Sequence, residues 1–253
     1  MRGLKGKVVA IVGAATGIGK ATAIRLQEEG AHLVLGDINV AGIEQVARQV
    51  NEAGGKAVAM RCDISDDASV KALVDFAVET YGGIDCMHAN AADLSAVLSD
   101  TDAVSVPLEI FDRTIAVNLR GHLLCTRHAV PELLKRGGGS IVYTSSAAAF
   151  AGEPERVAYA ISKSGLNALM RHVASRWGKQ GIRANAVAPG MILTEAILGN
   201  MPEEMQQTVI AMGRSPRLGK PEDIAAMVAL LFSDDGEWIN GQVVGVDGGV
   251  TMR

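Results

Sequence analysis

The sequence predicts a single α/β domain built around a doubly wound parallel sheet of seven strands. Short apolar segments alternate with longer amphipathic segments over all 253 residues, which is typical of strands connected by helices. The short segments are almost continuously apolar, as in KVVAIVG at residues 7–13, which indicates strands buried on both faces. A glycine-rich turn follows the first of them. We therefore expect one domain, residues 1–253, with its ligand crevice at the carboxyl ends of the strands.

The alternation assigns a residue range to every expected element. Strands are expected at residues 7–13, 32–37, 57–63, 84–90, 140–146, 182–189 and 242–249. Helices are expected at residues 17–29, 41–53, 67–80, 109–136, 157–179, 201–212 and 221–233. Two long connections, 91–108 and 190–220, follow strand ends, so both are expected to overhang the crevice.

Composition narrows the class of protein before any motif is considered. The formal net charge is −4 and no basic run occurs, which argues against a nucleic-acid partner. No apolar stretch is long enough to cross a bilayer, and no apolar signal core follows the charged residues 1–7. Cys62, Cys86 and Cys125 form no CxxC pair and lie in apolar contexts, so we expect buried free thiols and a cytoplasmic protein.

A glycine-rich turn, VGAATGIGKA at residues 12–21, connects the first strand to the first helix. Its glycines, Gly13, Gly17 and Gly19, are spaced G-x-x-x-G-x-G. Such a turn lets the backbone approach a pyrophosphate closely and points helix N–H groups at it. A glycine turn alone is weak evidence, but a strand before it and a helix after it favour a dinucleotide site.

Two aspartates end strands beside this turn. Asp37 closes the second strand, where a carboxylate can accept hydrogen bonds from the ribose hydroxyls of adenosine. It would repel a 2′-phosphate, and no cation stands at positions 15, 16, 38 or 39, so the sequence favours NAD over NADP. Asp63 closes the third strand and is expected to reach an adenine amine. For both residues, capping of the following helix is the alternative.

The segment VAYAISKSGL, residues 157–166, places Tyr159 four residues before Lys163, so both side chains lie on one side of a helix. An isolated tyrosine has a pKa of about 10, too high for a base at neutral pH. A nearby cation lowers such a pKa by roughly one to three units. Tyr159 is therefore expected to exchange a proton while hydride moves between an alcohol carbon and nicotinamide. A serine at the end of the fifth strand, Ser145 or Ser146 on opposite sides, would hold the substrate oxygen.

Several further motifs occur in one order along the chain. They are the glycine loop 13–19, Asp37, CDIS at 62–65, ANAA at 89–92, VNLRG at 117–121, Ser146, the Tyr159–Lys163 pair, PGMILT at 189–194 and GQVVGVDGG at 241–249. From residue 6 to residue 250 the chain resembles the single-domain short-chain dehydrogenases/reductases. Each motif is weak alone, but the ordered set is specific. The resemblance implies a Rossmann-like fold, an enzyme acting on CH–OH groups, and a homotetramer.

The resemblance also implies a role for each matching position. Tyr159 would be the general acid and base, Lys163 would lower its pKa and bind the nicotinamide ribose, and Ser146 would orient the substrate oxygen. Asn118 would hold a water that connects Lys163 to solvent, although an amide that satisfies a local helix break is the alternative. The implied cofactor-binding positions are Gly13, Thr16, Gly17, Ile18, Gly19, Asp37, Asp63, Ile64, Asn90, Tyr159, Lys163, Pro189, Gly190, Ile192 and Thr194.

Three positions depart from the family pattern. Val12 replaces a threonine, Ala89 an asparagine and Ala92 a glycine. The first two changes are expected to cost stability rather than chemistry, and the methyl group of Ala92 is expected to narrow the site slightly.

Two other groups of residues have competing interpretations. His122 and Cys125 have helical i, i+3 spacing, but no further ligand accompanies them, so we expect packing and no metal site. The methionines of the second long connection fit either an apolar lid or a helix core. They are Met191, Met201, Met205 and Met212.

Three functions follow from these patterns. The first is an NAD-dependent dehydrogenase that interconverts a secondary alcohol and a ketone, with a hydrophobic or cyclic substrate because both long connections carry few charges. The second is a 3-oxoacyl thioester reductase, which we expect to prefer NADPH. The third is a non-catalytic regulator that responds to NAD, and an intact Ser–Tyr–Lys set argues against it.

Overall fold

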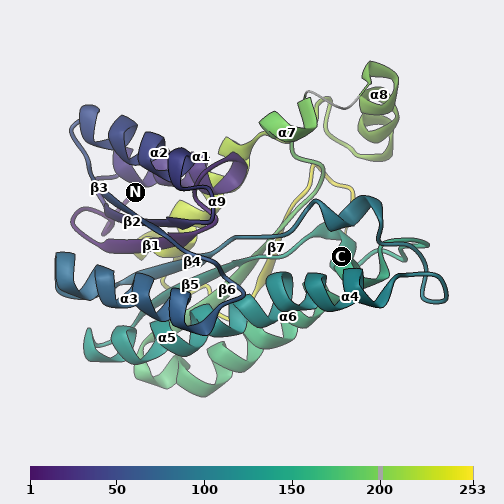
Figure 1. Ribbon diagram of the computed structural model, residues 1–253. Helices are drawn as coiled ribbons and strands as arrows, with labels where there is room; N and C mark the ends of the chain where they lie inside the picture. Colours follow the sequence, from purple (N-terminus) through teal and green to yellow (C-terminus); the bar gives the residue numbers. More distant parts are fainter. Residues whose placement is uncertain (199–201, 253) are drawn as a thin grey trace.

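The computed structural model describes residues 1–198 and 202–252, and it confirms the seven-stranded parallel sheet (Figure 1). The strands follow the order β3-β2-β1-β4-β5-β6-β7, and every neighbouring pair is parallel. Their bounds are β1 Val8–Val12, β2 His32–Asp37, β3 Lys56–Arg61, β4 Cys86–Ala89, β5 Gly139–Thr144, β6 Ile182–Pro189 and β7 Val243–Val246.

Helices connect these strands and cover both faces of the sheet. They are α1 Gly17–Glu28, α2 Val40–Glu52, α3 Asp67–Tyr81, α4 Leu108–Ile115, α5 Gly121–Lys135, α6 Val157–Trp177, α7 Glu195–Leu198, α8 Glu203–Met212 and α9 Pro221–Phe232. Short 3-10 turns occur at Ala96–Leu98, Ala147–Ala149, Gly178–Gln180 and Asp234–Gly236. No helix in the described part of the chain is long and apolar enough to span a membrane.

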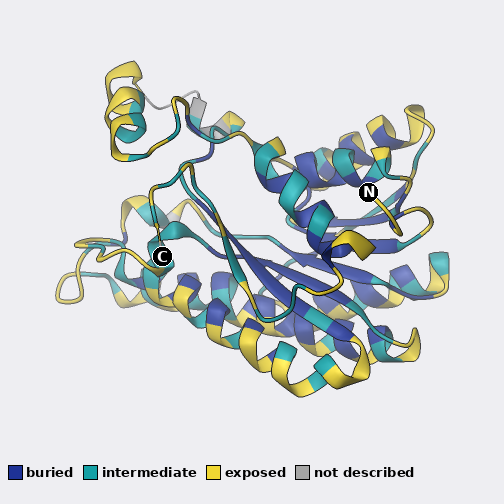
Figure 2. Cartoon of the chain, turned by 180° about the vertical axis from the view of Figure 1, so that it is seen from behind, coloured by how far each residue is buried: buried dark blue, intermediate teal, exposed yellow. Residues whose placement is uncertain are grey.

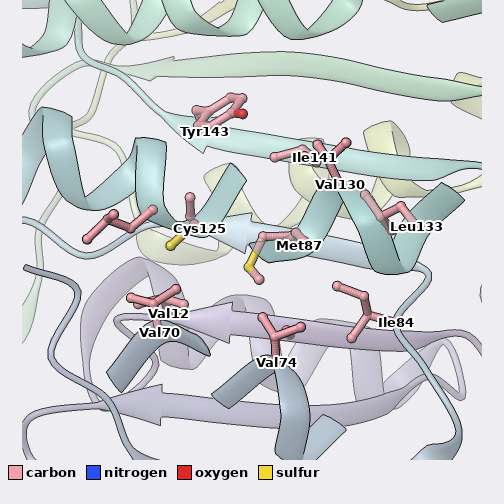
Figure 3. Close-up of a cluster of buried hydrophobic side chains, with 14 of the residues drawn as sticks. Val12, Val70, Val74, Ile84, Met87, Cys125, Val130, Leu133, Ile141 and Tyr143 are labelled. Carbon is pink, nitrogen blue, oxygen red and sulfur yellow. The ribbon is translucent and has the colours of Figure 1, made fainter. Parts of the chain in front are cut away.

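The strands explain why the core has two halves. Successive side chains of a strand point to opposite faces, so Val8, Ala10 and Val12 join one apolar cluster while Val9 and Ile11 join the other. Helices α3, α5 and α6 cover the first face, and α1, α2 and α9 cover the second (Figures 1 and 2). Figure 3 shows the first cluster, in which side chains from β1, β4 and β5 meet those of α3 and α5.

The predicted helix at 109–136 is the main element that differs. It is two α-helices, α4 and α5, separated by one π-helical turn at Ala116–Arg120. Such π turns occur inside α-helices, and this one, with the sequence AVNLR, contains no glycine or proline that would mark it. The helix predicted at 201–212 is α8, which begins at Glu203; Met201 lies outside the described residues.

The order of the strands contains the topological switch point at which the crevice is expected. Because β1 pairs with β2 on one side and with β4 on the other, the chain direction across the sheet reverses between β1 and β4. The carboxyl ends of these two strands carry the glycine loop and the ANAA segment. The structure therefore brings together motifs that are about 75 residues apart.

The three cysteines are buried free thiols, as predicted. Burial raises the pKa of Cys62 and of Cys86 to about 12, so both thiols stay protonated. His122 and Cys125 are also buried. Among the described residues, no group of three or more His, Cys, Asp and Glu side chains is placed to bind a metal ion.

Candidate active site

The glycine loop is held tightly against the neighbouring strand ends. The Gly13 N–H donates to the Gly36 carbonyl at 2.8 Å, and the Gly13 carbonyl accepts from Asn90 Nδ2 at 2.8 Å. Gly13 has a φ of +87°, and a Cβ on Gly19 would lie 1.9 Å from the Gly13 carbonyl oxygen. Glycine is therefore required at both positions for the turn to close.

The start of α1 has the properties of an anion site. Thr16 is the N-cap residue but makes no side-chain capping bond, and the first turn contains no acidic residue. A Cβ on Gly17 would lie 3.1 Å from the Thr194 side chain, so that side chain faces the loop. Thr194 Oγ1 is buried and has no hydrogen-bond partner within the described chain. Ile18 packs into the α1 side of the core and fixes the helix. Open N–H donors and an unpaired hydroxyl fit a pyrophosphate here.

Asp37 does not cap the helix that follows it. Asn39 is the N-cap residue of α2, and its side chain accepts from the Gly42 N–H at 3.1 Å. The Asp37 carboxylate instead accepts from the N–H of Ala15 at 3.1 Å and from the N–H of Asn39 at 2.9 Å. The alternative of simple capping is therefore wrong for Asp37, whose carboxylate borders the glycine loop.

Asp63 does not cap the helix that follows it either. Asp66 caps α3 by accepting a backbone N–H at 2.9 Å. Asp63 accepts from the N–H and hydroxyl of Ser65 at 3.0 and 2.7 Å, and the hydroxyl bond holds the pKa of this carboxyl below its usual value. Ile64 is buried, and a Cβ on Gly121 would lie 2.8 Å from it, so Ile64 also packs against α5.

The three predicted reacting side chains meet where β5 ends and α6 begins. Lys163 Nζ lies 5.6 Å from the centroid of the Tyr159 ring and donates to the Thr144 carbonyl at 2.8 Å. Ser146 lies close enough to Tyr159 to lower the pKa of the phenol. Ser145 is buried, and its hydroxyl donates to the Lys163 carbonyl at 3.3 Å. Because successive residues of a strand point to opposite sides, the side chain of Ser146 faces the phenol and that of Ser145 faces the backbone of α6.

The electrostatics of this group differ from the sequence-based expectation. Burial raises the pKa of Tyr159, while the hydrogen bond with Ser146 and the charge of Arg156 oppose the rise. Burial lowers the pKa of Lys163 to about 7. The predicted depression of the phenol pKa by Lys163 is not seen, because burial disfavours the charged form of both groups. At neutral pH the phenol is protonated and is a proton donor.

Asn118 lies in the π turn between α4 and α5. Its Oδ1 accepts from the N–H of Asp93 at 2.8 Å, so this amide oxygen binds the connection 91–108 and not the backbone of the π turn. Its Nδ2 is buried and has no hydrogen-bond partner in the described parts of the chain. A buried, unpaired amide donor is the kind of group that holds an internal water.

The PGMILT segment closes the other side of the crevice. Pro189 ends β6, and the Gly190 N–H donates to the β7 backbone at 3.3 Å. Ile192 is buried and forms an isolated parallel bridge with Gly219. The Thr194 N–H then donates to the Ile192 carbonyl at 2.9 Å, which directs Thr194 toward the start of α1.

Sequence reasoning missed a buried polar chain beneath the site. His88 Nε2 lies 3.0 Å from Thr144 Oγ1, and this hydroxyl donates to Asn90 Oδ1 at 2.9 Å. Burial lowers the pKa of His88 to about 3, so the ring is neutral and Nε2 is the atom that carries the proton. The chain fixes the Asn90 amide that holds Gly13. A histidine within an otherwise apolar strand was the only sequence signal for it.

The methionines of the second connection do not form a helix core where they are described. Met205 and Met212 lie on α8, which has no buried residue, and both side chains are exposed. Figure 1 shows α7 and α8 beyond the carboxyl ends of the strands. The core interpretation is therefore wrong for these two residues, and the lid interpretation remains a proposal.

The doubly wound parallel sheet, with an anion site at its switch point and polar side chains beside it, is typical of dinucleotide-binding α/β proteins. The family model for enoyl-(acyl carrier protein) reductase matches residues 13–251. A probable short-chain type dehydrogenase/reductase of Bradyrhizobium diazoefficiens is 40% identical over 246 residues, covering 97% of this chain and 88% of the relative. The 3-oxoacyl-(acyl-carrier-protein) reductase of Thermotoga maritima is 35% identical over 249 residues, covering 98% and 99%.

Solved structures agree with these matches. A 7α-hydroxysteroid dehydrogenase in complex with NADH and 7-oxo glycochenodeoxycholic acid has a TM-score of 0.91 at 34% identity, covering 97% of this chain and 94% of that chain. The chain belongs to the short-chain dehydrogenase/reductase family, whose members are oxidoreductases that use a nicotinamide cofactor.

Proposed function

We propose that this protein is an NAD-dependent dehydrogenase that interconverts a secondary alcohol and a ketone. The observation that carries the proposal is the meeting of Ser146, Tyr159 and Lys163 at the carboxyl end of β5, next to the glycine loop and its anion site. Hydride transfer to a carbonyl carbon leaves negative charge on its oxygen, and a positioned proton donor lowers that barrier.

Each reacting side chain has a distinct part in the proposed reaction. Bound nicotinamide would supply or accept the hydride. Ser146 would hydrogen-bond the substrate oxygen and fix its geometry. Tyr159 would donate its proton to the oxygen of a ketone and accept it back from an alcohol. Lys163 would contact the cofactor ribose, and its ammonium would then lie near the phenol.

The remaining assignments of site residues belong to the same proposal. Asn118 is the residue we assign to a water that passes protons between Lys163 and solvent, because its Nδ2 is buried and unpaired in the described structure. The glycine loop and Thr194 are assigned to the pyrophosphate and the nicotinamide end. Asp63 and Ile64 are assigned to the adenine, with Asn90, Pro189, Gly190 and Ile192 lining the crevice.

Preference for NAD over NADP is inferred from Asp37. Its carboxylate borders the glycine loop, where two hydrogen bonds from backbone N–H groups hold it in place. A carboxylate there accepts hydrogen bonds from ribose hydroxyls and repels a 2′-phosphate. The structural relative that carries NADH in its complex is consistent with this preference.

A hydrophobic or cyclic substrate is inferred from the two long connections. Leu94 and Leu98 are exposed on the first, and Met205 and Met212 on the second. Exposed apolar side chains on segments that overhang a crevice suit an apolar ligand. We assign α7 and α8 to a lid over that ligand. The structural relative is a hydroxysteroid dehydrogenase, and a steroid is both cyclic and largely apolar.

We also propose a homotetramer in the cytoplasm. Leu123 on α5 and Ile161 on α6 are exposed apolar residues, and Leu123 borders a groove between the two helices. Trp238, just before β7, is almost completely exposed. Three buried free thiols suit a reducing compartment, and the net charge of −4 gives no support to a nucleic-acid partner.

A 3-oxoacyl thioester reductase is the second candidate, and the Thermotoga maritima relative favours it. Such an enzyme is expected to prefer NADPH. A non-catalytic regulator that responds to NAD is the third candidate. Such a protein would not need a serine and a tyrosine beside a buried lysine. Tight NADH binding without turnover of any alcohol or ketone would favour the regulator.

One screen distinguishes the three candidates. The purified protein is assayed by the absorbance of NADH and NADPH against cyclic and linear secondary alcohols, their ketones and a 3-oxoacyl thioester. The proposal expects turnover of cyclic alcohols with NAD and a lower kcat/KM with NADP. A higher kcat/KM for the thioester with NADPH would contradict it.

A further inference from the structure

Helix α6, which carries Tyr159 and Lys163, has no capping residue of its own. Arg156 is the N-cap residue, its side chain makes no capping bond, and the first turn contains no acidic side chain. Arg156 also has a φ of +63°, the only positive value at a non-glycine residue in the described chain. The first four N–H groups of a helix have no partner within that helix, so here they need one from elsewhere.

Two residues of the distant connection 91–108 bind all four of these groups. The N–H of Arg156 donates to the Asp100 carbonyl at 3.0 Å, and that of Val157 to the Thr101 carbonyl at 3.3 Å. The N–H of Ala158 donates to Asp100 Oδ1 at 3.0 Å. The N–H of Tyr159 itself donates to Asp100 Oδ2 at 2.8 Å. The carboxylate of one residue, 59 positions away, therefore binds the backbone of the proposed acid directly.

The environment of Asp100 strengthens these bonds. The residue is only 3% exposed, so the carboxylate has little water to compete with the two N–H donors. Hydrogen bonds to an ionised acceptor are roughly twice as strong as neutral ones, and a negative charge is stabilised at a helix N-terminus. Asp100 thus replaces the local cap that the sequence of α6 lacks.

The connection that presents Asp100 is itself ordered by local bonds. Asp102 Oδ1 accepts from the N–H of Val104 at 2.8 Å and of Ser105 at 3.1 Å. The Ser105 hydroxyl donates to Thr101 Oγ1 at 2.9 Å. These bonds form a compact turn directly after Asp100, and none of them involves α6.

We propose that Asp100 is a positioning residue for Tyr159. It holds the first turn of α6 so that the phenol stays beside Ser146, and it connects the loop that overhangs the crevice to the proton donor. This inference rests on the proposed function of Tyr159. Without the carboxylate the first turn loses a charged group that accepts from two N–H groups, and the phenol moves from Ser146. The pKa of Tyr159 then rises further, because Ser146 no longer opposes the effect of burial.

The test compares Asp100→Asn with Asp102→Asn. Both variants remove one carboxylate from the same loop, but Asp102 is exposed and accepts only from its own turn. In Asp100→Asn the amide can accept one of the two N–H groups and presents a donor to the other. We expect kcat to fall about tenfold to a hundredfold, as for a small misplacement of a reacting group. The pH profile of alcohol oxidation should move to higher pH, while the NADH Kd changes less than about twofold.

Asp102→Asn should match the wild type in all three measurements. A change in melting temperature alone, with kcat per folded molecule and the pH profile of Asp100→Asn unchanged, would reduce Asp100 to a structural cap and overturn the proposal. Asp100→Ser, which keeps a single small acceptor, gives a second variant should the first fold poorly. Its kcat should lie at or below that of Asp100→Asn.

A further readout separates this inference from the proposed function. Ionisation of Tyr159 is followed by ultraviolet difference absorbance against Tyr159→Phe, in protein without substrate. Asp100→Asn should raise the pKa of Tyr159, and Asp102→Asn should leave it in place. Absence of turnover in the wild type would contradict the proposed function only, whereas an unmoved Tyr159 titration in Asp100→Asn would overturn the role of Asp100.

Discussion

Replacing Asp37 with asparagine tests how the protein chooses between NAD and NADP. The asparagine has nearly the same shape, so the fold of the glycine loop is retained, but the negative charge is lost. The carboxylate accepts from the N–H of Ala15 and from that of Asn39, and an amide oxygen can still accept one of these bonds. The main consequence is therefore electrostatic, and it should change the selectivity between the two cofactors.

The size of the effect follows from the position of the carboxylate. Two unit charges about 4 Å apart repel by about 4 kcal/mol at an effective dielectric constant of about 20. Asp37 is half-buried at a strand end, so solvent screening reduces this to about 2 kcal/mol. Since about 1.4 kcal/mol is tenfold, kcat/KM with NADP should rise about thirtyfold relative to NAD.

The assay is steady-state kinetics with both cofactors at one substrate concentration. Asp235→Asn is the matched control, because it removes the same charge but pairs with Arg2 near the amino terminus, away from the glycine loop. The control should keep the cofactor ratio of the wild type. A ratio for Asp37→Asn within about threefold of the wild type would refute the assignment of Asp37 to the ribose.

Three other changes test separate parts of the account. Gly19→Ala should abolish NADH binding, measured by fluorescence titration, because its Cβ would lie 1.9 Å from a backbone oxygen; Gly152→Ala, with open space at its Cβ, should bind normally. Burial lowers the pKa of Lys163 to about 7, so between about pH 7 and pH 10 the unfolded chain binds a proton at Lys163 that the folded protein does not. The unfolding free energy of cofactor-free protein should therefore rise with pH over this range, and Lys163→Met should lose this rise in denaturant titrations. Asn39→Ala should lower stability by about 1 kcal/mol in the same titrations without changing the cofactor ratio, since Asn39 caps α2.

The sheet could be predicted because its strands are buried on both faces. Nearly continuous apolar runs such as that of β1 can be recognised in the sequence, and the ends of each predicted strand lie within three residues of those of an observed one. The glycine loop could also be predicted, because the positive φ at Gly13 and the close backbone contact at Gly19 require glycine. The π turn around Asn118 was not predicted, because its residues include no glycine or proline that would interrupt a helix.

Interactions between distant residues account for most of what the sequence did not show. No pattern indicates that Asp100 binds the backbone of Tyr159, or that His88 reaches Asn90 through Thr144, because the partners are far apart in the chain. The directions of the pKa shifts of Tyr159 and Lys163 could not be predicted from the sequence either. The spacing of Tyr159 and Lys163 predicted their proximity, but burial decides the direction of both shifts.

The central claim is that the phenol of Tyr159 moves the proton while hydride is transferred, and Tyr159→Phe tests it most directly. Tyr143→Phe is the matched control, because it removes a phenol that hydrogen-bonds Thr126 within the core. Turnover of an alcohol accepted by the wild type is measured together with the NADH Kd. The account predicts that Tyr159→Phe loses at least about a hundredfold in kcat with an unchanged NADH Kd, and that Tyr143→Phe keeps its kcat. Wild-type kcat in Tyr159→Phe would contradict it.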